Sequence, residues 1–213
     1  MKYIDKVEQA KKDINAVIEK YSKIVVFNSF GKDSMVVFHL AWQIKPDINV
    51  VSIMTPFKFK ETFDYKKIME AKYKMNIKTF MRNDGPKWLW KKKPNECCEY
   101  YKIQPTKEAL RNYDAWITGL RRTEGKTRTS FDVIEKKGDI IKVNPILDFE
   151  EIDVWRYLAV NNIPVNPMYA KGYRSLGCEP CSSPEEDESD LERDGRWRGC
   201  EKQECGMHST ILK

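Results

Sequence analysis

Short apolar runs alternate with longer amphipathic segments along most of this chain of 213 residues. The apolar runs predict buried strands, which span residues 23–27, 48–54, 77–81, 114–119 and 139–143. The amphipathic segments place apolar residues at helical spacing and predict helices over residues 4–20, 35–44, 61–74 and 150–161. This order predicts an α/β fold with a doubly wound, mostly parallel sheet, in which ligands bind beyond the carboxyl ends of the strands.

The pattern changes at Pro184. Residues 185–190 read Glu-Glu-Asp-Glu-Ser-Asp, an acidic run without apolar anchors, which predicts a flexible linker. We therefore expect one α/β domain over residues 1–183, followed by an acidic linker and a mobile tail over residues 184–213.

Composition narrows the class of protein. A hydrophobic fraction of 41% suffices for one core, and no apolar run approaches the roughly 20 residues that span a bilayer. The first residues lack the shape of a signal peptide, so we expect a cytoplasmic protein whose thiols are reduced. The net charge of +6 suits an anionic ligand but is too small to indicate nucleic acid by itself.

A polar turn separates the first strand from the next helix. It consists of Ser29, Phe30, Gly31, Lys32, Asp33 and Ser34. Glycine allows a tight turn, the helix that follows presents free N–H groups to an anion, and Lys32 adds a positive charge. The turn is not a Walker A loop, because that motif requires a glycine where this chain has Val26. It resembles the S-x-G-x-D-S loop of the PP-loop superfamily, which binds adenine nucleotides.

Cysteines supply the second chemical signal. Cys97 and Cys98 are adjacent, and Cys178 and Cys181 form a C-x-x-C pair. Thiolates are soft ligands that select zinc or an iron–sulfur centre. An adjacent pair is awkward for one tetrahedral ion but suits a cubane cluster, in which each thiolate binds a different iron. Cys205 stands apart, in a Glu-Cys-Gly-Met-His run near the end of the chain, and is typical of a reactive thiol.

Several of these segments together resemble one family, the assimilatory adenylyl-sulfate reductases. The resemblance is carried first by residues 97–102 and 172–181, and then by residues 117–122, 143–155, 193–197 and 204–208. It implies a 4Fe–4S cluster held by Cys97, Cys98, Cys178 and Cys181. It also implies that Lys102, four residues after the tandem cysteines, lies near both the cluster and the substrate.

The resemblance further implies a reaction at Cys205. Its thiolate would attack the sulfur of adenylyl sulfate or 3′-phosphoadenylyl sulfate, and thioredoxin or a similar dithiol would release sulfite from the resulting S-sulfonate. We expect His208 to orient or deprotonate the thiol and Lys102 to act beside it. Substrate contacts are expected from the polar turn and from Thr55, Gly119, Arg121, Arg122, Arg193, Arg196 and Trp197. A homo-oligomer is expected, without membrane or nucleic-acid partners.

Two departures from the family keep other hypotheses open. The polar turn is intact where the reductases usually have a degenerate one, and Met54-Thr55-Pro56 replaces a common Asp-Thr-Gly. Residues 57–62 look more like the small subunit of bacterial ATP sulfurylase. One alternative is therefore an ATP-cleaving PP-loop enzyme, either an adenylyltransferase or a cluster-dependent tRNA thiolase. Another is an iron–sulfur or zinc module that binds nucleic acid. The nucleotide itself also stays open, because Lys32 could serve a 3′-phosphate.

Overall fold

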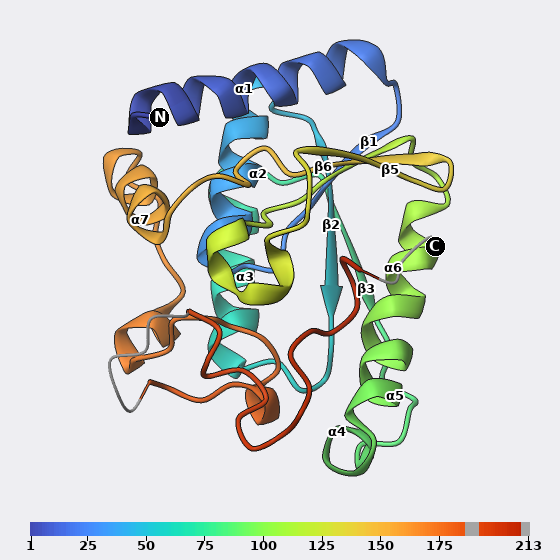
Figure 1. The fold of residues 1–213 in the computed structure, drawn as a ribbon. Coiled ribbons are helices and arrows are strands. Elements are labelled where there is room, and N and C mark those ends of the chain that lie inside the picture. The colour runs from blue at the N-terminus through green and yellow to red at the C-terminus, as the bar shows by residue number, and fades with distance from the viewer. Residues whose placement is uncertain (186–191, 210–213) are drawn as a thin grey trace.

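The computed structural model describes residues 1–185 and 192–209, which form a six-stranded sheet flanked by helices (Figure 1). The strand order is β3-β2-β1-β4-β6-β5. The five strands expected from the sequence are present and parallel to one another: β1 (Ile24–Phe27), β2 (Asn49–Met54), β3 (Ile77–Met81), β4 (Ala115–Ile117) and β6 (Ile140–Val143). The predicted α/β class with a doubly wound, mostly parallel sheet is confirmed.

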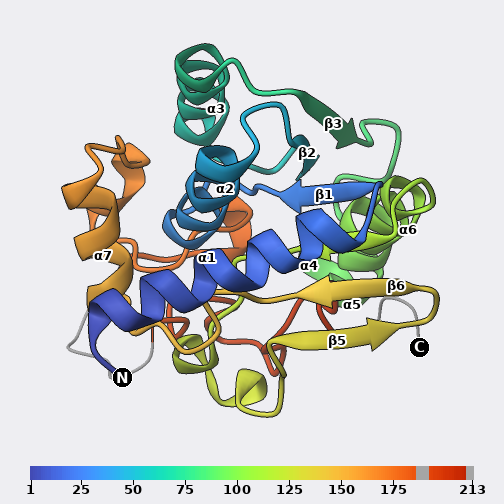
Figure 2. The ribbon, with the colours of Figure 1, turned by 90° about the horizontal axis from the view of Figure 1, so that it is seen from above.

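The sheet buries both of its faces. In β1, Ile24 and Val26 belong to one apolar core, whereas Val25 and Phe27 belong to the other, as the alternation of side chains in a strand requires. The first core is closed by the longer helices, and Figures 1 and 2 show them on the opposite side of the strands from α6 (Gln104–Leu110). These longer helices are α1 (Tyr3–Lys20), α2 (Lys32–Ile44), α3 (Lys60–Tyr73) and α7 (Glu151–Val160).

Two parts of the fold were not expected from the sequence. The edge strand β5 (Ile134–Lys137) pairs antiparallel with β6. Between β3 and β4 lies a helical stretch that covers the second face of the sheet: α4 (Leu89–Lys92), α5 (Pro94–Cys98), a π-helical turn over Glu99–Ile103, and α6. No helix within residues 1–185 and 192–209 combines the length and the apolar character needed to cross a membrane.

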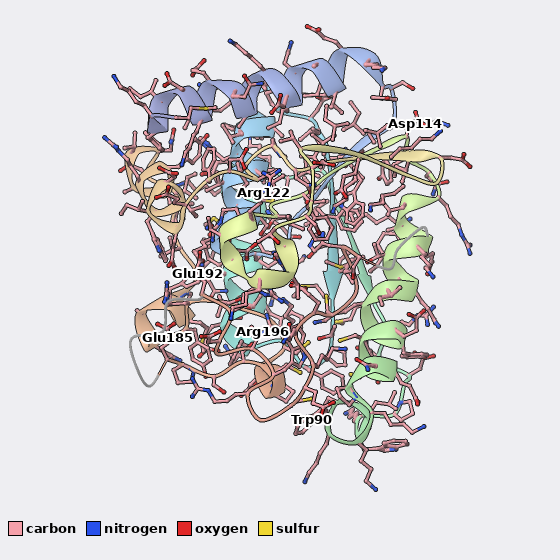
Figure 3. All side chains as sticks on the ribbon, viewed as in Figure 1. Trp90, Asp114, Arg122, Glu185, Glu192 and Arg196 are labelled. Carbon is pink, nitrogen blue, oxygen red and sulfur yellow. The ribbon has the colours of Figure 1, made fainter. Side chains whose placement is uncertain are left out.

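The strand order places a crevice between β1 and β4. From β1 the chain proceeds outward to β2 and β3, then returns to form β4 on the other side of β1. At such a switch point the connections leave in opposite directions, so a crevice opens at the carboxyl ends of the strands. In Figure 3, Asp114, just before β4, lies in the upper part of the molecule, and Arg196 of the tail lies below it, in the direction in which β2 runs in Figure 1.

The described part of the tail, residues 192–209, lies against this carboxyl end (Figure 1). Its backbone pairs with the segment around Cys181: Ser183 N donates to Gly195 O at 2.8 Å, and Trp197 N donates to Cys181 O at 3.2 Å. Farther along, Met207 packs against the second core. Of the linker expected at residues 185–190, residues 186–190 lie outside the described part of the chain, so the division at residue 183 stays a prediction.

Candidate active site

The polar turn after β1 is held in shape by Asn28. The Oδ1 atom of Asn28 accepts hydrogen bonds from the N–H of Phe30, at 2.8 Å, and from the hydroxyl of Ser34, at 2.9 Å. Phe30 has a φ of +62°, a conformation that non-glycine residues rarely adopt, and its ring is fully buried against Tyr65. The sequence predicts a substrate contact for Phe30, but the structure places its side chain in the core.

Gly119 packs directly on the start of α2. A Cβ atom at this position would lie 2.8 Å from the carbonyl carbon of Asp33 and 2.9 Å from the backbone nitrogen of Ser34. Because such distances are too short for any side chain, a glycine is required here for the loop after β4 (residues 118–125, the β4 loop) to approach the polar turn.

Two of the predicted substrate cations face away from the crevice. Lys32 is almost fully buried, and its Nζ donates to the carbonyl oxygen of Arg174 at 2.6 Å. Arg121 is fully buried and donates from Nε to Asp33 Oδ1 at 2.6 Å. Burial opposes the charge of Lys32, but Asp33, Tyr169 and Glu192 raise the pKa of its ammonium above its usual value. Both cations are therefore neutralised within the protein.

Arg122 also lies away from the crevice. It pairs with Asp148 and donates to the carbonyl oxygen of Phe131 at 2.8 Å. The structure shows no contact between Arg122 and the cavity described next.

One cavity at the carboxyl ends of β1, β2 and β4 unites most of the remaining candidates. Its lining combines the polar turn, the π-helical turn and the tail. The predicted site residues in this lining are Ser29, Gly31, Asp33, Ser34, Lys102, Gly119, Arg193, Arg196, Trp197, Cys205 and His208.

Positive charge gathers around the sulfur of Cys205. Lys58 and Lys102 line the cavity and interact electrostatically with Cys205 and with Cys178. Burial lowers the pKa of Lys58 to about 8, with Lys102 and Arg196 acting in the same direction. Burial opposes the charge of Lys102 as well, but the sulfurs of Cys178, Cys98 and Cys205 raise the pKa of its ammonium. An anion bound in this part of the cavity would therefore offset the repulsion among Lys58, Lys102 and Arg196.

Glu204, the residue before Cys205, binds the tail to the α/β domain. Glu204 accepts from Arg128 Nε at 2.8 Å and lies 3.2 Å from the guanidinium of Arg193. Arg196 donates from Nε to Cys181 O at 2.9 Å, and Gly177 leaves the space that its guanidinium fills. These bonds fix the approach of Cys205 to the cavity.

Among the described residues, no hydrogen bond joins His208 to Cys205. Its ring stacks on Trp116, with centroids 5.8 Å apart and planes 8° apart. The Nδ1 atom is buried and has no hydrogen-bond partner within the described residues. Burial, together with the charges of Lys142 and Arg128, holds the pKa of His208 well below its usual value. In this conformation the histidine is a neutral packing residue.

A second, smaller cavity adjoins the first and is lined by all four predicted ligand cysteines, Cys97, Cys98, Cys178 and Cys181. Lys102 lines both cavities. Thr55, expected to contact substrate, instead lies here, with its hydroxyl 3.1 Å from Cys178 Sγ. Burial raises the pKa of the Cys178 thiol, but Lys102 and Lys58 outweigh it, so that the pKa is lowered overall.

The cysteines do not converge on one point. Among the described residues, no three His, Cys, Asp or Glu side chains are arranged as ligands of a single metal ion. All six thiols are free of disulfide bonds. Burial raises the pKa of Cys97 to about 12, with the sulfur of Cys98 adding to the effect. The hydroxyl of Tyr101, which lines the same cavity, is buried without a hydrogen-bond partner in the described part of the chain.

Comparison with known proteins decides between the hypotheses. Residues 23–184 match the family model described as the phosphoadenosine phosphosulfate reductase domain. The chain belongs to this reductase family. The match includes the polar turn and the four cysteines of the smaller cavity, and it ends before the described part of the tail.

Curated relatives extend the similarity beyond the matched domain. A protein of Lysinibacillus sphaericus named adenosine 5′-phosphosulfate reductase is 39% identical over 88% of this chain and 84% of its own length. A protein of Staphylococcus epidermidis with the same name is 37% identical over 97% of this chain and 89% of its own length. The similarity to these reductases therefore extends over most of both chains.

Solved structures support the fold alone. The phosphoadenylyl-sulfate reductase of Candida auris superposes with a TM-score of 0.72 at 20% identity, covering 81% of this chain and 89% of that one. The FMN adenylyltransferase of Candida glabrata gives a TM-score of 0.70 at 17% identity, covering 99% and 78%. The chain thus shares its fold with both of these proteins.

Some residues of the reductase site have no signal in the sequence pattern. Lys58, Glu124 and Trp116 all line the main cavity. Lys58 stands between Phe57 and Phe59, and its side chain is buried. Only the position of Lys58 after β2 points to the site, because loops at the carboxyl ends of parallel strands gather around the crevice.

Proposed function

We propose that the protein catalyses the thiol-dependent reductive cleavage of a sulfonucleotide to sulfite and an adenosine nucleotide, as part of sulfate assimilation. The observation that carries this proposal is the position of Cys205, which lines one cavity together with the polar turn and a group of cations. Family membership and the names of the relatives point to the same reaction.

The chemistry balances without an external oxidant. The thiolate of Cys205 forms a bond to the sulfur of the sulfonucleotide, the bond from that sulfur to the phosphate oxygen breaks, and the nucleotide leaves with the electron pair. A thiolate of a dithiol such as thioredoxin then attacks the Sγ atom of Cys205 and releases sulfite. The second thiol of the donor resolves the mixed disulfide, so two electrons come from the dithiol.

The cations of the cavity make the first step possible. A thiolate approaches an anionic sulfate group, and Lys58, Lys102 and Arg196 offset the repulsion in a site that is largely shielded from water. Arg128 and Arg193 hold Glu204, so they orient Cys205 through its neighbour. His208 has no part in this step in the described conformation.

The preferred substrate is adenylyl sulfate. The case for a 3′-phosphate depended on a free charge at Lys32, but that ammonium is buried and paired with Glu192 at 2.8 Å. The curated relatives carry the name of the enzyme that acts on adenosine 5′-phosphosulfate. The same pairing weakens the ATP-cleaving alternative, because Lys32 does not face the cavity in which phosphates would bind.

The four cysteines of the smaller cavity fit a 4Fe–4S cluster. A cubane spreads its thiolate ligands over four irons, so Cys97, Cys98, Cys178 and Cys181 need not converge on one point. Lys102 and the unpartnered hydroxyl of Tyr101 suit an anionic, sulfide-rich neighbour. The cluster would supply negative charge and rigidity beside the sulfate group. Iron and sulfide analysis should show loss of the cluster in Cys97→Ala and retention in Cys200→Ala.

A sulfite-release assay tests the function. Protein purified without oxygen is incubated with each sulfonucleotide, with and without thioredoxin. We expect sulfite from adenylyl sulfate only when the dithiol is present, no release by Cys205→Ser, and unchanged release by Cys200→Ser, whose thiol is exposed. Full activity in Cys205→Ser, or pyrophosphate from ATP instead, would contradict the proposal. Thioredoxin as donor, a homo-oligomer and a cytoplasmic location stay predictions.

A further inference from the structure

The carboxylate of Glu192 in the tail contacts two cations of the α/β domain. Lys32 Nζ lies 2.8 Å from Glu192 Oε2, and Arg121 donates from one terminal nitrogen to both carboxylate oxygens, at 2.7 and 2.6 Å. The side chains of all three are almost fully buried, with exposed fractions of 4%, 1% and 0% for Glu192, Lys32 and Arg121. The tail therefore joins the polar turn and the β4 loop through one buried carboxylate.

The charges of this cluster are balanced only when the tail is docked. Asp33 pairs with Arg121 at 2.6 Å but lies 3.9 Å from Lys32 Nζ. The other carboxylate near Lys32 is Glu151, at 3.6 Å, and Glu151 is engaged by Arg174 at 2.6 Å. Glu124 also acts on Arg121, but it is paired with Arg128. Without Glu192, Lys32 and Arg121 would therefore share Asp33 as the one nearby carboxylate that no other cation engages, which is unfavourable at low dielectric.

We propose that Glu192 is a positioning residue, which docks the tail onto Lys32 and Arg121 and so holds Arg193, Arg196 and Cys205 toward the cavity. The inference rests on the proposed function for its catalytic consequence. It accounts for a departure from the family pattern: the intact Gly-Lys-Asp-Ser turn is retained because Lys32 and Asp33 belong to the network that receives the tail. Figure 3 shows Glu192 and Arg196 on the same side of the molecule, below the β4 loop.

Two glutamates of the tail form ion pairs with cations outside it. Glu192 precedes Arg193 and Arg196, and Glu204, bonded to Arg128, precedes Cys205. The segment between the two glutamates carries the basic residues that line the cavity. If Glu192 loses its ion pairs, this segment keeps its backbone pairing with residues 181–183 and the ion pair between Glu204 and Arg128. It then loses its contact with the polar turn.

Hydrogen–deuterium exchange tests the docking without reference to activity. The variants are Glu192→Gln and, from the other side of the contact, Lys32→Met. Glu201→Gln, an exposed carboxylate of the same tail, is the matched control. We expect amides of residues 193–200 to exchange at least about tenfold faster in both variants than in the control, while amides of β1 and β4 keep their wild-type rates.

Single-turnover kinetics then tests the positioning role. We expect Glu192→Gln to slow formation of the Cys205 S-sulfonate by about 10- to 100-fold, since misplaced reacting groups lose rate steeply. Reduction of preformed S-sulfonate by the dithiol should change by less than about twofold, because that step does not need the substrate cavity. A loss of general stability would slow both steps alike.

The outcomes separate this proposal from the proposed function. If wild-type protein forms no S-sulfonate but tail exchange rises in both variants, the function is wrong and the docking stands. If Glu192→Gln matches Glu201→Gln in tail exchange and in S-sulfonate formation, the docking role is wrong. Faster exchange throughout β1 and β4 would also overturn it, because the cluster would then stabilise the body rather than the tail.

Discussion

Replacing Gly119 with alanine should disturb the site through one methyl group. The new Cβ would lie 2.8 to 2.9 Å from backbone atoms of Asp33 and Ser34, whereas ordinary contacts begin at 3.4 Å. Backbone atoms cannot rotate aside, so the β4 loop and the start of α2 must separate by about half an ångström. Overpacking of this kind costs about 1–3 kcal/mol of unfolding free energy, or roughly 2–12 °C in Tm for a chain of this size.

The displaced atoms belong to the cavity, so activity should fall with stability. We expect kcat/KM of Gly119→Ala to fall about 10- to 100-fold, measured by sulfite release. Gly125→Ala is the stability control, because its Cβ would meet only the flexible side chain of Arg193, at 3.4 Å, and its Tm should change by less than about 2 °C. Wild-type Tm and kcat/KM in Gly119→Ala would refute the close packing described here.

Three further predictions concern buried ionisable side chains. His39 is buried against Tyr157, and burial lowers its pKa to about 4 from an unfolded value of 6.5. Because the unfolded chain binds a proton at His39 more readily than the folded protein, the free energy of unfolding falls by up to about 3 kcal/mol as the pH drops from 6.5 toward 4. In denaturation experiments, the free energy of unfolding of His39→Gln should fall less over this pH range. An unchanged decline would exclude this histidine as its source. Lys58→Met should lower kcat/KM about 10- to 100-fold through the loss of one cavity cation, whereas Lys60→Met, at an exposed lysine, should not; equal effects would contradict the assignment of Lys58 to the cavity. Glu204→Gln should slow S-sulfonate formation about tenfold in single-turnover assays by weakening its bond to Arg128, and a wild-type rate would show that this bond does not orient Cys205.

Local patterns predicted the five parallel strands but not the antiparallel edge strand β5. β1 and β2 are continuous apolar runs because they are buried on both faces, and such runs are visible in sequence. β5 reads Ile-Glu-Lys-Lys, a polar edge strand whose pairing is settled only by its neighbour β6. Residues 89–110 form several short helical pieces around buried cysteines, so they lack the apolar period of one long helix.

In the candidate site, the sequence likewise did not predict how the charged residues are paired. The motifs indicated which residues carry chemistry, and Lys102 and Cys205 do line the cavity. The motifs could not show that Lys32 and Arg121 are neutralised by Glu192, because that ion pair joins residues far apart in the chain. Lys58 was missed for the related reason that a buried lysine and an exposed one look alike in a sequence.

The most direct test of the account follows the sulfo group itself. Protein is mixed with adenylyl sulfate in the absence of any dithiol, and the tail peptide that contains Cys205 is analysed by mass spectrometry. The account predicts one added SO₃ group on Cys205, which disappears as sulfite when thioredoxin is supplied. Sulfite formation without this adduct, or an adduct on Cys200 in place of Cys205, would contradict it.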